Sequence, residues 1–361
     1  MTREGSPAPT RVLFVSSEFG TPRHRCEIPI EGLAKAGVDA DLIRIEELGD
    51  SVLSGADTGR LTRYSHVVLN RVPLSPGVER MVDQLSRSET KVLFDVDDLL
   101  FDPELLARLP FVLRREPEAR ARLLEAAAGI RETMRRCCGV LCATSKLASE
   151  AAHLNRTVVV ENCVSNRLVE LSDAAVRDRP RDPPSATLGF LCGHEGHLLD
   201  LELIREPLSV LLRENPSLRL RFVGLVERAG PILEDLRDRI DLVPYVPWPV
   251  LPTQIAVMDV CLAPLVSDRF TECKSDLRYL EAALCGVPLV ASPVGQTPES
   301  ITDGVNGFLA DGPGEWIDRV QVLLSDPERR REMGLAARRD VLTHRRAEQM
   351  GRAILEALKQ Q

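Results

Sequence analysis

Short apolar runs rich in β-branched residues alternate with longer amphipathic runs along almost the whole chain. The short runs have the length and composition of strands that are buried on both faces of a parallel sheet. The longer runs fit helices that connect one parallel strand to the next. The pattern therefore predicts α/β layers.

The strand-like runs fall into two series, and a chain of 361 residues exceeds the roughly 250 residues at which single cores stop growing. Between 162 and 185 the pattern fails, and VRDRPRDPPSA has the prolines and alternating charges of an interdomain crossing. We predict a Rossmann-like domain over 1–165, a linker over 166–185, a second Rossmann-like domain over 186–345, and a C-terminal helix over 346–361 that could return to the first domain. The predicted strands are Arg11–Ser16, Asp39–Ile45, His66–Arg71, Val92–Val96, Val140–Thr144 and Thr157–Glu161, then Thr187–Leu191, Leu218–Gly224, Asp241–Val246, Asp259–Pro264, Pro288–Ser292 and Gly307–Ala310.

Charge and hydropathy exclude several kinds of partner. The formal net charge of -8 and the pI near 5.5 argue against a nucleic-acid surface, which needs a basic face. No run approaches the roughly 18–20 apolar residues of a membrane span, and MTREGSPAPT lacks the apolar core of a signal peptide. We expect a cytoplasmic protein without a membrane span.

The nine cysteines include no CxxC pair and no ligand-like spacing with histidine. We therefore predict reduced core cysteines and no metal site. The sequence leaves the oligomeric state open.

The segment 270–293 carries the clearest functional signal. A helix over Ser275–Cys285 would put Glu281 on one stripe with Leu277, Leu280 and Leu284, and so on the side that faces the core. A buried carboxylate needs partners, which the hydroxyls of a ribose or hexose would supply, while Lys274 and the helix start would hold a diphosphate. The alternative is an edge glutamate with a solvated surface lysine.

In open parallel sheets, ligands bind beyond the carboxyl ends of the strands, and two facing sheets would form a cleft. This rule selects the segments SSEFGTPRHR, DVDDLLFD, CGHEGH, PYVPW and SDRFTECKS. We expect these loops to carry the chemistry.

Three motifs of the second half resemble retaining GT-B glycosyltransferases of family 4 (glycosyl transferases group 1). The donor motif KS-x-L-K/R-x-x-E-A-x-x-x-G-x-P corresponds to residues 274–288, with Lys274, Ser275 and Glu281 at its polar positions. ESITDGVNGFLA over 299–310 is similar to a second motif, and GFLCGHEGHLLDL over 189–201 places His197 and Asp200 on the histidine and aspartate of a third. PRHRCEIPIEGLAKAG, FDVDDLLFD and VVVENCVSN match the first half less tightly.

The resemblance implies two Rossmann-like domains facing across a cleft. It also implies transfer of a sugar from a nucleoside diphosphate donor of UDP, GDP or dTDP type to an acceptor hydroxyl, with retention and with neither metal nor further cofactor. Glu281 corresponds to the glutamate that binds the donor ribose. Cys273 stands where many members have another glutamate, with Glu272 beside it, and 193–204 lacks the arginine and lysine that grip the diphosphate in many members.

Other assignments follow from the selected loops. We predict donor contacts from Ser275, Glu272, Gly193, His194, His197, Tyr245, Val246 and Arg25, and catalytic roles for Lys274, Asp97 and Asp98. Each has a plainer alternative: a histidine can cap a helix, an aromatic residue can pack in the core, and an arginine can lie on the surface.

DVDDLLFD permits three interpretations. Its aspartates could cap a helix, or line a catalytic or acceptor loop at the position where many family members have a His-Asp pair. The sequence D-x-D also resembles the nucleophile motif of haloacid dehalogenase-like phosphatases, in which Asp95 would attack phosphate, Asp97 would act as acid and base, and magnesium would be needed. A sugar-nucleotide 2-epimerase or a non-catalytic GT-B protein are the remaining alternatives to a glycosyltransferase.

Overall fold

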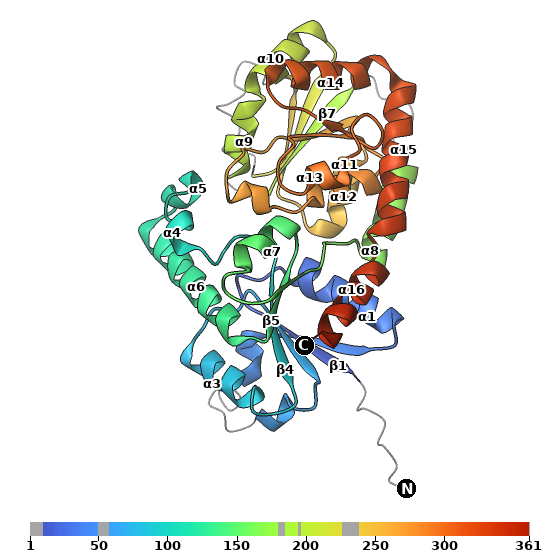
Figure 1. Ribbon diagram of the computed structural model, residues 1–361. Coiled ribbons are helices and arrows are strands. Elements are labelled where there is room, and N and C mark those ends of the chain that lie inside the picture. Colours follow the sequence, from blue (N-terminus) through green and yellow to red (C-terminus); the bar gives the residue numbers. More distant parts are fainter. Residues whose placement is uncertain (1–9, 50–57, 180–184, 194–195, 226–237, 361) are drawn as a thin grey trace. The chain divides into compact units, whose positions relative to one another are not determined.

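The computed structural model describes residues 10–49, 58–179, 185–193, 196–225 and 238–360. The chain forms two compact units. Unit 1 comprises 1–163 together with 347–361, and unit 2 comprises 164–346. Each unit contains one parallel six-stranded sheet with helices on it (Figure 1).

The sheet of unit 1 has the strand order β2-β1-β3-β4-β5-β6. Neighbouring strands are parallel throughout, and each is connected to the next through helices or turns, as buried apolar strands require. The strands are β1 (Arg11–Ser16), β2 (Asp39–Arg44), β3 (His66–Asn70), β4 (Lys91–Val96), β5 (Gly139–Cys142) and β6 (Thr157–Val159). The helices and helical turns are η1 (Arg23–Glu27), α1 (Ile28–Lys35), η2 (Ile45–Leu48), η3 (Thr58–Arg60), α3 (Pro76–Leu85), α4 (Pro103–Leu106), α5 (Pro110–Leu113), α6 (Pro117–Arg136), α7 (Ser145–Ala151) and α16 (Ala347–Lys359).

The last helix, α16, packs beside α1 in unit 1 (Figure 1). The two helices approach through glycines: a Cβ at Gly351 would lie 2.3 Å from the carbonyl carbon of Gly32, and a Cβ at Gly32 would lie 2.0 Å from the oxygen of Ala347. Met350 and Ile354 of α16 belong to the core of unit 1 together with Val12 and Phe14 of β1. The end of the chain thus completes the first core.

The sheet of unit 2 has the order β12-β11-β10-β7-β8-β9 and is also parallel throughout. One apolar cluster lies under α10 and α14, and another lies under α8, α11 and α12. The strands are β7 (Thr187–Cys192), β8 (Arg219–Gly224), β9 (Ile240–Pro244), β10 (Val260–Ala263), β11 (Leu289–Ala291) and β12 (Phe308–Leu309). The helices and turns are α8 (Asn166–Arg177), α9 (His197–Leu203), α10 (Arg205–Glu214), η6 (Trp248–Val250), α11 (Leu251–Ile255), η7 (Thr271–Cys273), α12 (Leu277–Leu284), α13 (Thr297–Ser300), α14 (Pro313–Ser325) and α15 (Pro327–His344).

The structure confirms the predicted α/β class and finds a strand at each predicted run, with ends that differ by at most two residues. It differs at 166–185, predicted as a linker, because much of this range is helix α8. The hydroxyl of Ser165 accepts from the N–H of Leu168 and caps α8, and the buried Leu168 and Ala175 join a core cluster of unit 2.

All nine cysteines are free, and eight of them are buried, with Cys138 exposed. Within the described ranges, every helix is too short or too polar to cross a bilayer.

Candidate donor site in unit 2

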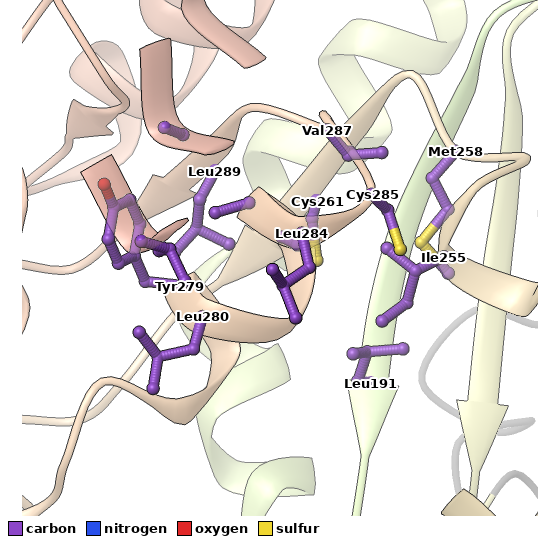
Figure 2. Close-up of a cluster of buried hydrophobic side chains, with 14 of the residues drawn as sticks. Leu191, Ile255, Met258, Cys261, Tyr279, Leu280, Leu284, Cys285, Val287 and Leu289 are labelled. Carbon is purple, nitrogen blue, oxygen red and sulfur yellow. The ribbon is translucent and has the colours of Figure 1, made fainter. Parts of the chain in front are cut away.

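Glu281 lies in helix α12, whose apolar side is fixed in a core cluster. Tyr279, Leu280 and Leu284 of this helix pack with Leu191, Cys261 and Leu289 of three central strands (Figure 2). Glu281 itself is only 7% exposed, which confirms the predicted burial. Its Oε2 accepts a hydrogen bond of 2.7 Å from Nη1 of Arg278, one turn earlier. The described residues give Oε1 no hydrogen-bond partner.

Loops from the carboxyl ends of β7, β10 and β11 meet beside α12. The N–H of Val266, after β10, donates to Asp200 of α9 at 2.9 Å. The N–H of Leu265 donates to Ser292, after β11, and the N–H of Gln296 donates to the carbonyl of Lys274. The chain therefore brings two of its selected segments, those after β7 and β10, together with the loop after β11 at one sheet edge, as parallel topology requires.

Gly193, directly after β7, and His197, at the start of α9, lie next to Arg278 of α12. The Gly193 N–H donates to Nδ1 of His197 at 3.0 Å. A Cβ at Gly193 would lie 3.2 Å from Nη2 of Arg278 and 3.7 Å from Cε1 of His197. Sequence reasoning named Gly193, His197 and Glu281 but missed Arg278, although this residue stands in the donor motif. The predicted residue His194 lies outside the described residues.

Asp200, in α9, is 4% exposed. Burial raises the pKa of Asp200 to about 6, although the N–H of Val266 and the charge of Lys274 oppose the rise. The hydrogen bond from the N–H of Val266 to Asp200 holds the β10 loop against α9. The Asp200 carboxyl group also lies near enough to Lys274 to interact with its charge.

Lys274 and Ser275, between η7 and α12, are partly exposed. The ammonium of Lys274 lies 4.8 Å from the ring centroid of Phe270. Asp276, at the N-cap of α12, is buried and ion-paired with Arg345 at 2.9 Å. The N-terminal end of α12 therefore already has a carboxylate beside it, and the partly exposed Lys274 adds a positive charge to the same loop.

Glu272 and Cys273 occupy the turn η7, where the predicted sugar contact falls. Cys273 is fully buried, and its thiol donates to the carbonyl of Arg269 at 3.4 Å. Glu272 is partly exposed. Of these two residues, only Glu272 presents its side chain to solvent.

Tyr245 and Val246 follow β9, an edge strand that β8 separates from β7. Tyr245 is 71% exposed, whereas Val246 packs against the apolar cluster under α12. The predicted base contact from these residues stays a prediction.

In unit 1, Arg25 is fully buried and forms a two-pronged ion pair with Asp95, through distances of 3.0 and 2.8 Å. Its Nη1 donates to Val160 O and to Asn162. Burial alone would lower the pKa of Arg25, but the Asp95 carboxylate raises it above its ordinary value. This placement does not fit the predicted phosphate contact from Arg25, because its side chain does not reach solvent.

The same ion pair contradicts the phosphatase alternative. Asp95 is 2% exposed, both of its oxygens accept from Arg25, and Oδ1 also accepts from Asn70. A carboxylate held in this way is not available to attack a phosphate.

Asp97 and Asp98 are joined by Arg71, at the end of β3. Arg71 donates from Nε to Asp97 at 2.6 Å and from Nη2 to Asp98 at 3.1 Å, and its backbone is left-handed, with φ 51°. The other oxygen of Asp97 accepts from the Thr21 hydroxyl at 2.9 Å. Asp97 is buried, whereas the Asp98 side chain is 26% exposed, so Asp98 is the more accessible of the two predicted catalytic aspartates. Among the described residues, no three His, Cys, Asp or Glu side chains gather as a metal site requires.

The family model described as "Glycosyl transferases group 1" matches residues 193–326, which include all the loops gathered beside α12. This segment is therefore similar to members of the glycosyl transferases group 1 family. The chain is 32% identical over 174 residues to a D-inositol 3-phosphate glycosyltransferase of Pseudarthrobacter chlorophenolicus, covering 45% of this chain and 40% of the relative. It is 30% identical over 175 residues to a GDP-mannose-dependent alpha-(1-6)-phosphatidylinositol monomannoside mannosyltransferase of Mycolicibacterium smegmatis, covering 44% of each chain.

The chain therefore spans about two fifths of the length of these curated relatives. Its fold is similar over a longer range to that of Anabaena HepE, which was solved in complex with UDP. The TM-score is 0.64 at 14% identity, covering 98% of this chain and 100% of the other. Both units together thus have the GT-B fold, with two Rossmann-like domains.

Proposed function

We propose that this protein is a glycosyltransferase that moves a sugar from a nucleoside diphosphate donor to an acceptor hydroxyl with retention of configuration. The match over 193–326 supports the class of reaction. The donor would bind to unit 2, and the loops after the strands of unit 1, with the exposed side of Asp98, are candidates for the acceptor.

The observation that carries the proposal is the state of Glu281. This carboxylate is buried, one oxygen is held by Arg278, and the other has no hydrogen-bond partner among the described residues. This second oxygen can therefore accept a hydrogen bond from a ligand, and the hydroxyls of a ribose would donate it. Such a site discriminates strongly for a ligand that carries these hydroxyls.

The proposed reaction breaks the bond between the anomeric carbon and the diphosphate oxygen, which keeps the electron pair. The acceptor oxygen then bonds to the same face of the anomeric carbon, and its proton passes to the departing diphosphate. Preorganised cations favour this step because negative charge grows on the leaving group, and we assign part of this stabilisation to Lys274. We assign no step to a metal or to a further cofactor.

The donor base is proposed to be uracil, guanine or thymine. UDP is bound by the solved protein HepE, whereas GDP-mannose is named for the mycobacterial relative, so both diphosphates are the first to be tested.

The proposal is tested by calorimetry and thermal shift with UDP, GDP, dTDP and their sugar conjugates, with and without magnesium. Glu281→Ala should weaken binding of the recognised nucleotide roughly 10- to 100-fold, since hydrogen bonds to a charged group are lost. The matched control is Glu328→Ala, because Glu328 forms an exposed pair with Arg331 at the same helical spacing as Glu281 with Arg278.

Unchanged nucleotide affinity in a folded Glu281→Ala variant would contradict the proposed donor site. Conversion of the donor sugar without any acceptor would instead indicate the sugar-nucleotide 2-epimerase. Binding without turnover on any acceptor would indicate the non-catalytic alternative.

A further inference from the structure

The loop after β7 contains no arginine or lysine between Gly193 and Ile204, yet the structure brings a guanidinium to that loop from elsewhere. Arg278 comes from the first turn of α12, and its Nη2 lies 3.2 Å from the position of a Cβ on Gly193. Its other terminal nitrogen, Nη1, stays on Glu281. The Arg278 side chain is 30% exposed, so it is only partly covered.

We infer that Arg278 binds the diphosphate of the donor, in place of cations from the β7 loop. This inference rests on the proposed function and names the residue that would bind the diphosphate. A planar guanidinium can donate to Glu281 from one nitrogen and to a phosphate oxygen from another. Arg278 therefore connects the carboxylate assigned to the ribose with the charge on the leaving group.

His197 supplies a second donor on the same side. Its Nδ1 accepts from the Gly193 N–H, so Nδ1 carries no proton and the neutral ring carries its proton on Nε2. This tautomer makes Nε2 a hydrogen-bond donor while the ring orientation is fixed by the backbone. The His197 ring and the Arg278 guanidinium thus both lie near Gly193.

Gly193 explains how Arg278 gains this position. A methyl group at Gly193 would press on Nη2 at 3.2 Å, a tight contact with the flexible end of a side chain. Gly193→Ala should therefore displace the guanidinium by a few tenths of an ångström at little cost to folding. The glycine keeps open the space that Arg278 and its ligand share.

In the reaction, Arg278 neither gives nor takes a proton. Its charge stabilises the diphosphate oxygen that receives the electron pair when the glycosidic bond breaks. Its hydrogen bond to Glu281 keeps the guanidinium oriented throughout, which makes the stabilisation preorganised.

The test compares uridine, UMP and UDP, and the matching guanosine series, by calorimetry on the full chain. The quantity measured is the ratio of diphosphate affinity to nucleoside affinity. Arg278→Ala should lower this ratio roughly 10- to 100-fold and reduce its dependence on salt, as expected when a charge-assisted contact is lost. Arg278→Lys should recover part of the ratio, and Gly193→Ala should lower it. Glu281→Ala should weaken binding of the nucleoside itself and, because Glu281 orients the guanidinium, should lower the ratio less than Arg278→Ala does.

Arg331→Ala is the matched control, because it removes an arginine from an exposed pair of the same spacing. If neither Arg278→Ala nor Gly193→Ala changes the ratio of diphosphate affinity to nucleoside affinity, the inference is wrong, while the proposed function is unaffected. Equal loss of nucleoside and diphosphate in Arg278→Ala would also overturn the inference, because Arg278 would then only support Glu281. If Arg278→Ala fails to fold, Gly193→Ala carries the test. Failure of the wild type to bind any nucleotide would contradict the proposed function itself, and the inference with it.

Discussion

Asp200 is the described carboxyl group in unit 2 with the clearest shift in pKa. Its folded-state pKa is about 6, compared with an ordinary value of 3.8, so between these two pH values the folded state holds more protons than the unfolded state. Stability from this group is complete below pH 4 and is lost as the pH rises through 6.

We therefore expect Asp200→Asn to match the wild type near pH 4 and to exceed it in free energy of unfolding at pH 7. Asparagine can still accept from the N–H of Val266 but carries no charge to bury. Urea unfolding at several pH values between 4 and 7 measures the difference. Asp311→Asn, at an exposed residue, corrects for the general effect of removing a carboxylate. A difference that does not change with pH would contradict the assignment.

At the same scale, the sequence predicted some site residues and missed others for a physical reason. The burial of Glu281 follows from local helical spacing, which one segment contains. The burial of Arg25 depends on Asp95, 70 residues away, and the place of Arg278 depends on Gly193. Such contacts arise only when the sheet orders its strands, so local patterns present these arginines as ordinary surface charges.

At the scale of elements, strands were predictable because a parallel sheet buries both faces of its central strands, and this leaves apolar runs with sharp ends. Helix α8 was not predicted, because the prolines and charges that follow Arg177 made the whole range 166–185 resemble a linker. The sequence did suggest that the last helix could return to the first domain, but it did not show the contact with α1, since this contact depends on two glycines 319 positions apart (351 minus 32).

This contact predicts that Gly351→Ala destabilises unit 1. Alanine favours a helix by about 1 kcal/mol over glycine, but its Cβ would lie 2.3 Å from backbone of α1, and overpacking of this kind costs roughly 1–3 kcal/mol or more. Thermal and urea unfolding should show a net loss. Gly314→Ala in α14 is the control, because among the described residues nothing outside its own stretch of helix lies within 4 Å of the added methyl group, and only the helical gain remains. Equal stability gains in the two variants would disprove the tight helix contact.

At the scale of the whole molecule, the two units differ in how the chain builds them. Unit 2 is one continuous segment, 164–346, with its own apolar clusters and the proposed donor site. Unit 1 needs both ends of the chain, because Met350, Ile354, Ala357 and Leu358 of α16 are part of its core.

We therefore expect residues 164–346 expressed alone to fold and to bind the recognised nucleotide with an affinity close to that of the full chain. A chain that ends at Arg346 should keep unit 2 folded but lose unit 1. Burial of each large apolar side chain contributes about 1.5–3 kcal/mol, so α16 accounts for much of the roughly 5–15 kcal/mol that stabilises a domain. Hydrogen exchange resolved by segment is the measurement, with protection expected in β7–β12 and absent in β1–β6. Full protection of β1–β6 without α16 would mean that the first core closes on its own, and the last helix would then be an appendage rather than part of the fold.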